Sequence, residues 1–213
     1  MIGRVLVVGA TGPTGREVLA RAKAEGLAVR ALARNPARLA GVTDAIQGDV
    51  RDRESLVRAM AGIGAVVSAL GTKQTLQPVT LLSEGTRNIV EAMHEAGVSR
   101  LLCITGMGAG DSRGNGGFLY DRLILTTLLA RIYADKDRQE QVVRSSDLDW
   151  VLIRPARLVN AAAAGTYREI TRFANQRMTT ISRGDVAHFV VREVMFPRYH
   201  RQTVNLTDGP RTA

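Results

Sequence analysis

The feature that most constrains this chain lies near its start, where the apolar run Val5–Val8 leads into "GATGPTG" and then into residues typical of a helix. A strand that passes through a glycine-rich turn into a helix opens a βαβ unit. In such a unit the first glycine makes the tight turn, the second lets the backbone approach a pyrophosphate, and the third lets the helix pack against the strand. Gly9, Gly12 and Gly15 have this spacing. The stretch therefore predicts a dinucleotide-binding site.

The residues between these glycines suit a phosphate. The first turn of a helix presents unpaired backbone N–H groups and a partial positive charge, and Pro13 is tolerated there because its missing N–H would have no partner. Thr11 and Thr14 add hydroxyl donors. Glycines at this spacing also occur in tight strand-to-helix connections that bind no ligand, but the position after a strand and at the start of a helix favours a dinucleotide.

Strand-like and helix-like segments alternate along the chain. The apolar runs are Val5–Val8, Ala28–Ala33, Ala45–Ile46, Ala65–Leu70, Arg100–Thr105, Trp150–Arg154 and Thr203–Leu206. The helical patterns are Thr14–Gly26, Arg51–Ala61, Pro78–Gly97, Phe118–Ser145 and Arg183–Met195. This alternation predicts right-handed crossovers and a mainly parallel sheet, and the continuous apolar strands predict that both faces are covered. We expect an α/β fold, a single doubly wound Rossmann-type domain over residues 1–213 with a small C-terminal region on the substrate side.

The segment Gly106–Gly117 interrupts this alternation, because it has six glycines in twelve residues. Such a composition predicts a mobile loop without regular structure. We expect this loop to help choose the substrate.

The composition excludes several classes of protein. The single cysteine, Cys103, lies in the apolar run "LLCIT", which predicts a buried thiol in a reducing compartment, with no disulfide and no metal cluster. The few residues before the first strand leave no room for a signal peptide, and no apolar run approaches the ~20 residues of a membrane span, so we expect a cytoplasmic protein. The net charge is +9, but the arginines are scattered and only 4% of the residues are aromatic, which disfavours nucleic acid as a partner. The charge then forms a solvated surface or, in part, serves an anionic ligand.

The end of the second strand indicates which dinucleotide is bound. An NAD site places a carboxylate there for the adenosine ribose, whereas an NADP site places arginine there for the 2′-phosphate. The stretch "VRALARNPARL" has no acidic residue, and it offers Arg34 and Arg38. This favours NADP(H) over NAD(H), although exposed arginines are common in this chain.

Two further segments end at the same predicted edge of the sheet. Asp49 and Val50 follow the third strand in "QGDV", and Leu70 and Gly71 follow the fourth in "SALGT". Ligands of open α/β sheets bind at the carboxyl ends of the strands, so these residues are candidates for cofactor contacts. Asp49 could instead cap the following helix.

The motifs together resemble a known family. "GATGPTG", "LARNPARL", "GDV", "SALGT", "SEGTRNIVEAM", "YADKDRQE" and "DWVLIRPA" occur in this order and cover nearly the whole chain. They resemble the atypical short-chain dehydrogenase/reductases with an NAD(P)H-binding domain, most closely the biliverdin reductase B or flavin reductase branch. The resemblance implies an NADPH-binding Rossmann domain that reduces flavins, quinones, tetrapyrroles or related conjugated acceptors.

The resemblance also assigns roles to residues of this chain. It places the pyrophosphate on residues 11–15 and the 2′-phosphate on the two arginines after the second strand. The remaining cofactor contacts that it implies are Asp49 and Val50 along the adenine, Leu70 and Gly71 along the cofactor backbone, Lys136 at the nicotinamide ribose, and Pro155 and Ala156 against the nicotinamide.

The chain departs from the family pattern where the catalytic acid is expected. Most short-chain dehydrogenases use Tyr-x-x-x-Lys, in which the ammonium lowers the pKa of the phenol. No tyrosine here has a lysine four residues on; Tyr133 and Lys136 are three apart on one helix face. They could share part of that catalytic role, or Tyr133 could be a packed aromatic beside a lysine paired with Glu140.

Two other family positions are replaced. Gly106 stands where the branch has a serine, and Thr105 keeps a hydroxyl next to it. Arg157 stands where the branch has a histidine and is a candidate for substrate binding. Reduction of a flavin needs no protein acid for the hydride step itself, so these departures disfavour alcohol or ketone chemistry and leave conjugated acceptors open.

Three functions fit these residues. The leading hypothesis is an NADPH-dependent oxidoreductase that transfers a hydride to a small conjugated acceptor, with Thr105, Tyr133 and Lys136 as candidate catalytic residues. The second is a non-catalytic NADP-binding sensor of the NmrA-like type, for which a protein partner is possible. The third is an epimerase that keeps its NAD bound. The three histidines are far apart and predict no metal site.

Overall fold

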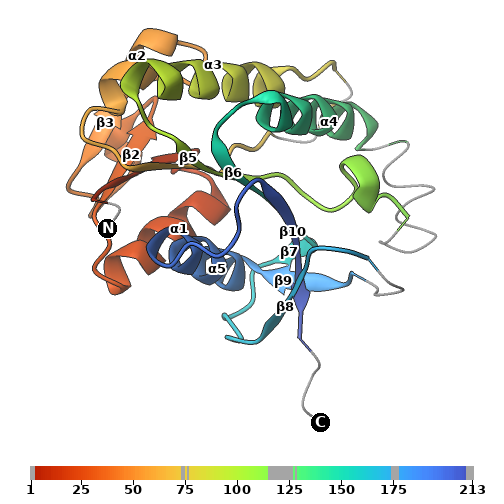
Figure 1. Ribbon diagram of the computed structural model, residues 1–213. Helices are drawn as coiled ribbons and strands as arrows, with labels where there is room; N and C mark the ends of the chain where they lie inside the picture. Colours follow the sequence, from red (N-terminus) through yellow and green to blue (C-terminus); the bar gives the residue numbers. More distant parts are fainter. Residues whose placement is uncertain are drawn as a thin grey trace.

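The computed structural model describes residues 3–72, 75, 77–114, 127, 129–173 and 178–209. In these ranges an eight-stranded sheet has the order β3-β2-β1-β4-β5-β6-β10-β8 (Figure 1). Its strands are β1 (Val5–Val8), β2 (Val29–Ala33), β3 (Ala45–Gln47), β4 (Ala65–Ser68), β5 (Arg100–Ile104), β6 (Asp149–Pro155), β8 (Tyr167–Ile170) and β10 (Gln202–Asp208). All neighbours pair in parallel except β10 and β8 at one edge. This confirms the predicted α/β fold with a mainly parallel sheet.

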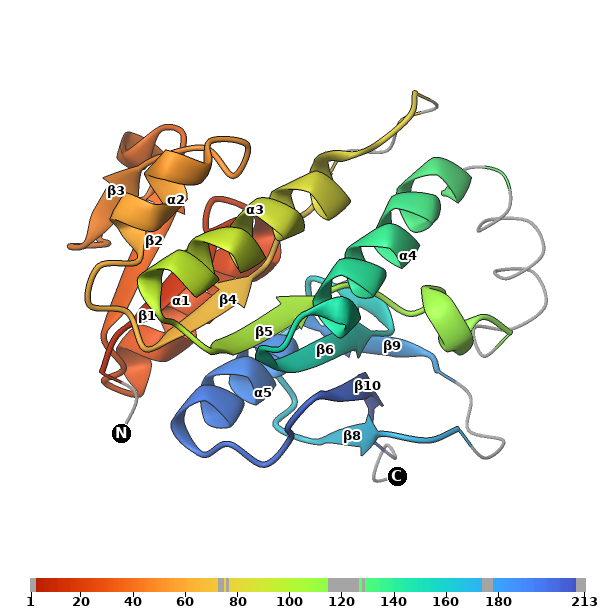
Figure 2. The same cartoon turned by 45° about the horizontal axis from the view of Figure 1, so that its top comes forward.

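Helices cover both faces of the sheet, as Figures 1 and 2 show. The helices α1 (Pro13–Ala24) and α5 (Arg183–Met195) pack together on one face. The helices α2 (Arg53–Ala59), α3 (Leu81–Ala96) and α4 (Ala130–Ser145) form a row on the other.

The strand sequences explain why the sheet has two buried faces. Side chains alternate between the faces of a strand, so Val5 and Val7 of β1 belong to the core under α1 and α5, whereas Leu6 and Val8 belong to the core under α2, α3 and α4. All four are at most 2% exposed. A continuous apolar run is therefore required here, in place of alternation with polar residues.

The order of the strands fixes where a ligand can bind. From β1 the chain proceeds outward through β2 to β3, and then returns to β4 on the other side of β1. In open α/β sheets the crevice for a ligand lies at this reversal, outside the carboxyl ends of the strands.

The C-terminal third contains strands that the apolar runs did not predict. A small parallel sheet joins β7 (Arg157–Val159) to β9 (Thr180–Ser182), and β8 forms the antiparallel edge of the main sheet. These strands have three or four residues each, too few for a periodic pattern to stand out.

The glycine-rich segment is partly ordered, and the prediction that it lacks regular structure was wrong for its described part. A short 3₁₀ helix, η2, spans Gly110–Ser112. The Ser112 hydroxyl accepts a hydrogen bond from Gly108 N and donates one to Ala109 O, which closes the turn. Residues 115–117, and most of the predicted helical start from 118 to 128, lie outside the described residues. The described helix begins at Ala130.

Within the described ranges, no helix is both long and apolar enough to cross a membrane.

Candidate functional site

A cleft of about 520 Å³ opens at the carboxyl ends of β1, β2, β4 and β5, where the strand order reverses. The predicted residues that line it are Gly9, Thr11, Gly12, Pro13, Thr14, Arg34, Asp49, Val50, Leu70, Gly71, Thr105 and Lys136. The fold thus brings together residues that are up to 127 positions apart in the chain. It leaves Gly15, Arg38, Tyr133, Pro155, Ala156 and Arg157 outside the lining.

The three glycines of the first turn have distinct surroundings. Gly9 has φ 78°, and a Cβ there would lie 2.4 Å from Ala69 O, so a side chain would collide with the end of β4. A Cβ at Gly15 would lie 2.3 Å from Gly9 O, so Gly15 lets α1 approach the turn. Gly12 has φ −73°, and a Cβ there would meet only Gly9 O, at 3.2 Å. Of the three glycines, Gly12 is thus the one at which the absence of a side chain leaves open space in the cleft.

The start of α1 is suited to an anion. Gly12 is the N-cap residue and Pro13 follows at the first helical position, with no side chain capping the helix. The first-turn N–H groups are therefore not occupied by a side-chain cap, and together with the helix dipole they favour a phosphate.

Arginines lie at the β2 and β3 end of the cleft. Arg34 follows β2, is exposed and lines the cleft, and Arg51 does so after β3. In the described ranges neither guanidinium forms an ion pair. Arg38 also lies in this region, in η1 (Pro36–Arg38), but outside the lining, where its carbonyl accepts a hydrogen bond from Arg16 Nη2. Arg51 was missed from the sequence, although its place directly after "QGDV" could have indicated it.

Asp49 does not cap α2. Its carboxylate accepts a hydrogen bond from Arg51 N, in a turn that precedes the helix. The N-cap is Asp52, whose carboxylate accepts from Glu54 N and Ser55 N. The alternative of a capping role for Asp49 was therefore wrong, and its side chain remains at the cleft.

At the β5 end of the cleft, Lys136 and Thr105 are joined through the backbone. The Lys136 ammonium donates a hydrogen bond to Thr105 O. The surrounding protein buries this amine and lowers its pKa to about 8, against the opposing effects of Cys103 and Glu140. Thr105 Oγ1 donates in turn to Glu140 Oε1, over 2.8 Å.

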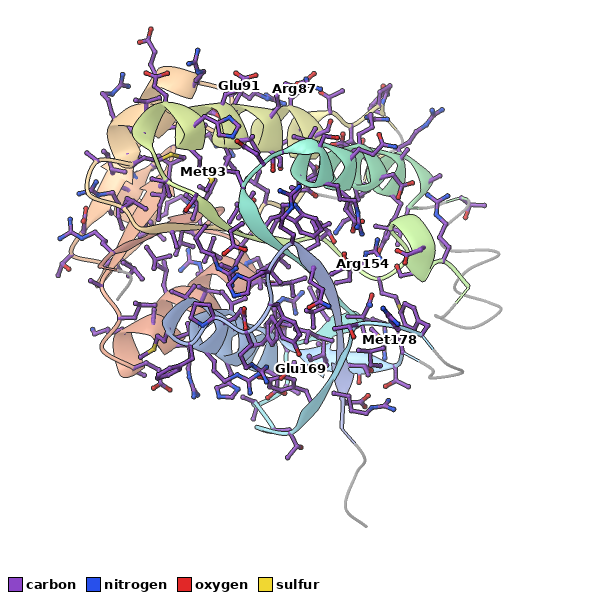
Figure 3. All side chains as sticks on the ribbon, in the orientation of Figure 1. Arg87, Glu91, Met93, Arg154, Glu169 and Met178 are labelled. Atoms are coloured by element: carbon purple, nitrogen blue, oxygen red, sulfur yellow. The ribbon has the colours of Figure 1, made fainter. Side chains whose placement is uncertain are left out.

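Glu140 forms a buried ion pair, with Arg154 of β6 instead of Lys136. Arg154 Nε lies 2.8 Å from Glu140 Oε1, and Nη2 lies 2.5 Å from Oε2. Arg154, which is labelled in Figure 3, also donates from Nη1 to Asp111 in η2, over 2.6 Å. The alternative that Lys136 pairs with Glu140 was wrong, because both oxygens of the Glu140 carboxylate accept hydrogen bonds from Arg154.

Gly106 explains how Tyr133 and Lys136 fit beside the cleft. A Cβ at position 106 would lie 2.9 Å from Lys136 Nζ and 3.3 Å from Tyr133 Oη. Lys136 Nζ lies 5.5 Å from the centre of the Tyr133 ring. Glycine, where the family branch has a serine, thus leaves the space that these two side chains use.

The segment after β6 differs from expectation. Pro155 O accepts a hydrogen bond from Met107 N, and Ala156 is buried in the core and donates to Leu206 O. Arg157 is exposed. The residues that do line the cleft from this part of the chain are Leu158 and Arg183, neither of which the sequence indicated.

A comparison with known families identifies the family of this chain. Residues 9–197 match the model of a family described as NAD(P)H-binding. The chain belongs to this NAD(P)H-binding family. The match begins at Gly9, directly after β1, and runs from α1 to the end of α5. It confirms the predicted family and its dinucleotide, NAD(P)H.

The individual relatives are longer than this chain, and only part of each one aligns with it. A (4-alkanoyl-5-oxo-2,5-dihydrofuran-3-yl)methyl phosphate reductase of Streptomyces griseus is 33% identical over 155 residues, which are 71% of this chain and 46% of that protein. A 3-diazoavenalumate denitrifying reductase of a Streptomyces species is 34% identical over 110 residues. This alignment covers 46% of this chain and 36% of that protein. The chain thus spans less than half the length of these two relatives.

Solved structures share the fold over the whole chain. The anaerobillin reductase ChuY of Escherichia coli O157:H7 has a TM-score of 0.81 at 23% identity, with 99% of each chain covered. A short-chain dehydrogenase/reductase of Veillonella parvula in complex with NADP has a TM-score of 0.82 at 16% identity, with 100% of this chain and 97% of that one covered.

Proposed function

We propose that this protein is an NADPH-dependent reductase that transfers a hydride to a small conjugated acceptor of the flavin, quinone or tetrapyrrole kind. The observation that carries the proposal is that Lys136 and Thr105 line the same cleft as the glycine turn of β1. The cofactor's phosphates and its reactive end would then occupy one continuous site. The names of the Streptomyces relatives, both of them reductases, support the same class of reaction.

The residues of the cleft fit the cofactor. The open space beside Gly12 and the uncapped first turn of α1 would take the pyrophosphate. A Cβ at Gly71 would have no atom within 4 Å, so the space beside this backbone is open and the cofactor could pass close to it. When bound, NADPH would supply the hydride.

NADPH is favoured over NADH by the charges at the β2 end. Arg34 and Arg51 line the cleft and have no ion-pair partner in the described ranges, and "VRALARNPARL" offers no carboxylate for a free ribose 2′-hydroxyl. A guanidinium keeps its charge at all relevant pH values and binds a phosphate through two parallel hydrogen bonds.

The proton that completes the reduction would come from Lys136 or from water. The acceptor gains a hydride and a proton, and oxidised cofactor leaves. Lys136 has a pKa of about 8 and is held at the cleft by Thr105 O, so its ammonium could give up a proton near neutral pH and regain one from solvent. Tyr133 would hold the lysine in place without transferring a proton.

A non-catalytic NADP sensor is the second candidate. Tyr133 lies outside the cleft lining, and the family's serine position is a glycine. A protein that only reports cofactor binding needs neither group.

One experiment separates the two. NADPH oxidation would be followed with a panel of flavins, quinones and dichlorophenol-type acceptors, and NADPH binding would be measured independently by fluorescence titration. We expect turnover with at least one conjugated acceptor, and its loss in Gly12→Val. A blank panel with tight NADPH binding would refute the reductase and support the sensor.

A further inference from the structure

Arg183 is a cation of the cleft that is not among the predicted cofactor contacts. The charged residues in the lining are Arg34, Asp49, Arg51, Lys136 and Arg183. The first three follow β2 and β3, on the side where the adenosine end would lie. Lys136 and Arg183 come from α4 and α5, helices on opposite faces of the sheet.

The guanidinium of Arg183 is only partly held by the protein. Its Nη1 lies 2.5 Å from Asn160 Oδ1, which directs the side chain. Its Nε is buried and has no hydrogen-bond partner in the part of the chain that the structure describes. Because this Nε has no exposed surface, an anion in the cleft would contact the terminal nitrogens of the guanidinium.

No carboxylate neutralises Arg183 in the described ranges. Asp185, two residues on, accepts hydrogen bonds from Ser182 Oγ and from the backbone N–H groups of Ala164 and Gly165, so its oxygens are occupied. A positive charge at the wall of a cleft, without a carboxylate partner in the described ranges, is suited to an anion of the ligand.

The surroundings of Arg183 indicate the shape of that ligand. Leu158 and Ile104 line the same cleft as Arg183, and both contribute to the apolar core under α1 and α5. An apolar wall beside a fixed cation suits a flat ring system that carries a carboxylate or a phosphate.

We propose that Arg183 binds an oxyanion of the acceptor, so that the preferred substrates are conjugated rings with a carboxylate or phosphate group. This inference rests on the proposed reductase function. It moves the substrate cation from Arg157, where the resemblance placed it, to Arg183.

The test compares acceptors that differ only in the anion. FMN and riboflavin share one ring system and differ by a phosphate, and biliverdin and its dimethyl ester differ by two carboxylates. We expect the protein to prefer the anionic member of at least one pair. In Arg183→Gln, kcat/KM for that anionic acceptor should fall about tenfold or more, as expected for a charge-assisted contact, while the neutral member stays within about twofold. Arg183→Lys should retain part of the preference.

The controls separate the acceptor from the cofactor. NADPH affinity should stay within about twofold in Arg183→Gln. Arg87→Gln, an exposed arginine on the outer face of α3 (Figure 3), should match the wild type in every assay. Thermal unfolding of each variant checks that the fold is kept.

Binding is measured as well as turnover, so that the inference is tested even if the reductase proposal fails. The four acceptors would be titrated onto the protein saturated with NADP⁺, by fluorescence quenching or calorimetry. Tighter binding of the anionic acceptor, lost in Arg183→Gln, supports the inference with or without turnover. Equal binding within both pairs, equal losses for charged and neutral acceptors, or a tenfold loss of NADPH affinity would overturn it.

Discussion

The buried ion pair between Glu140 and Arg154 leads to a quantitative prediction about stability. Arg154 is 1% exposed and Glu140 is 3% exposed, and two hydrogen bonds of 2.8 and 2.5 Å join them. Glu140 also accepts from Thr105 Oγ1. Glu140→Gln would leave the buried guanidinium with only the exposed carboxylate of Asp111 as a countercharge, and removing the buried member of such a pair costs about 3–5 kcal/mol. We expect the free energy of unfolding to fall by about 3 kcal/mol or more.

A neighbouring carboxylate provides the matched control. Asp111 contacts the same guanidinium over 2.6 Å, but its side chain is 81% exposed. Because solvent screens an exposed carboxylate, Asp111→Asn should cost roughly 0–1 kcal/mol. The double variant Glu140→Met/Arg154→Met should cost less than Glu140→Gln, because it leaves no unpaired charge in the core.

Urea unfolding gives the measurement. The midpoint and the slope m are determined for each variant, and the change in free energy is taken where m is unchanged. The reasoning would be refuted if Glu140→Gln lost less than about 1 kcal/mol, the level of an exposed pair, or if Asp111→Asn lost as much as Glu140→Gln.

Three further predictions concern the cleft. Gly12→Val should abolish NADPH binding in a protein with an unchanged unfolding midpoint, because its Cβ meets only Gly9 O at 3.2 Å and its methyl groups would project into the pyrophosphate space; normal titration of this variant would contradict the role of Gly12. Arg34→Ala should weaken NADPH binding by about 2 kcal/mol and NADH binding little, and equal losses would show that Arg34 does not contact the 2′-phosphate. Turnover should fall as the pH rises through about 8, because the Lys136 ammonium loses its proton there. Lys136→Ala should remove this pH dependence and lower turnover, whereas Tyr133→Phe should keep both the pH dependence and the turnover. A loss of about 10²-fold in the turnover of Tyr133→Phe, with normal NADPH binding, would make Tyr133 a general acid.

The sequence predicted the parts of the site whose signal is local. β1 and its glycine turn lie within fifteen residues, and each residue there has a conformational reason that spacing alone conveys, such as the positive φ of Gly9. The buried strands from β1 to β6 were predicted because a sheet covered on both faces demands uninterrupted apolar runs.

The parts that were missed depend on contacts between distant segments. The sequence placed Arg154 at the end of a predicted strand and offered Glu140 as a possible partner of Lys136, and neither position indicated that the two residues pair with each other in the core. Leu158 and Arg183 come from the small sheet of β7 and β9 and from the start of α5, and strands of three residues carry no periodic signal. Arg157 was proposed because the resemblance aligned it with a histidine. Neighbouring residues on a strand point to opposite faces, and in β7 it is Leu158 that lines the cleft.

Gly106 couples two positions of the chain that lie thirty residues apart. Any side chain at 106 would bring a Cβ to 2.9 Å from Lys136 Nζ, and since a lysine side chain is flexible, the ammonium could yield by leaving the Thr105 carbonyl. A lineage that acquired serine or alanine at position 106 would thereby relocate its amine while keeping the lysine itself. Position 106 is thus a site at which one small substitution, outside the helix that bears Lys136, could change the position of the proposed proton donor.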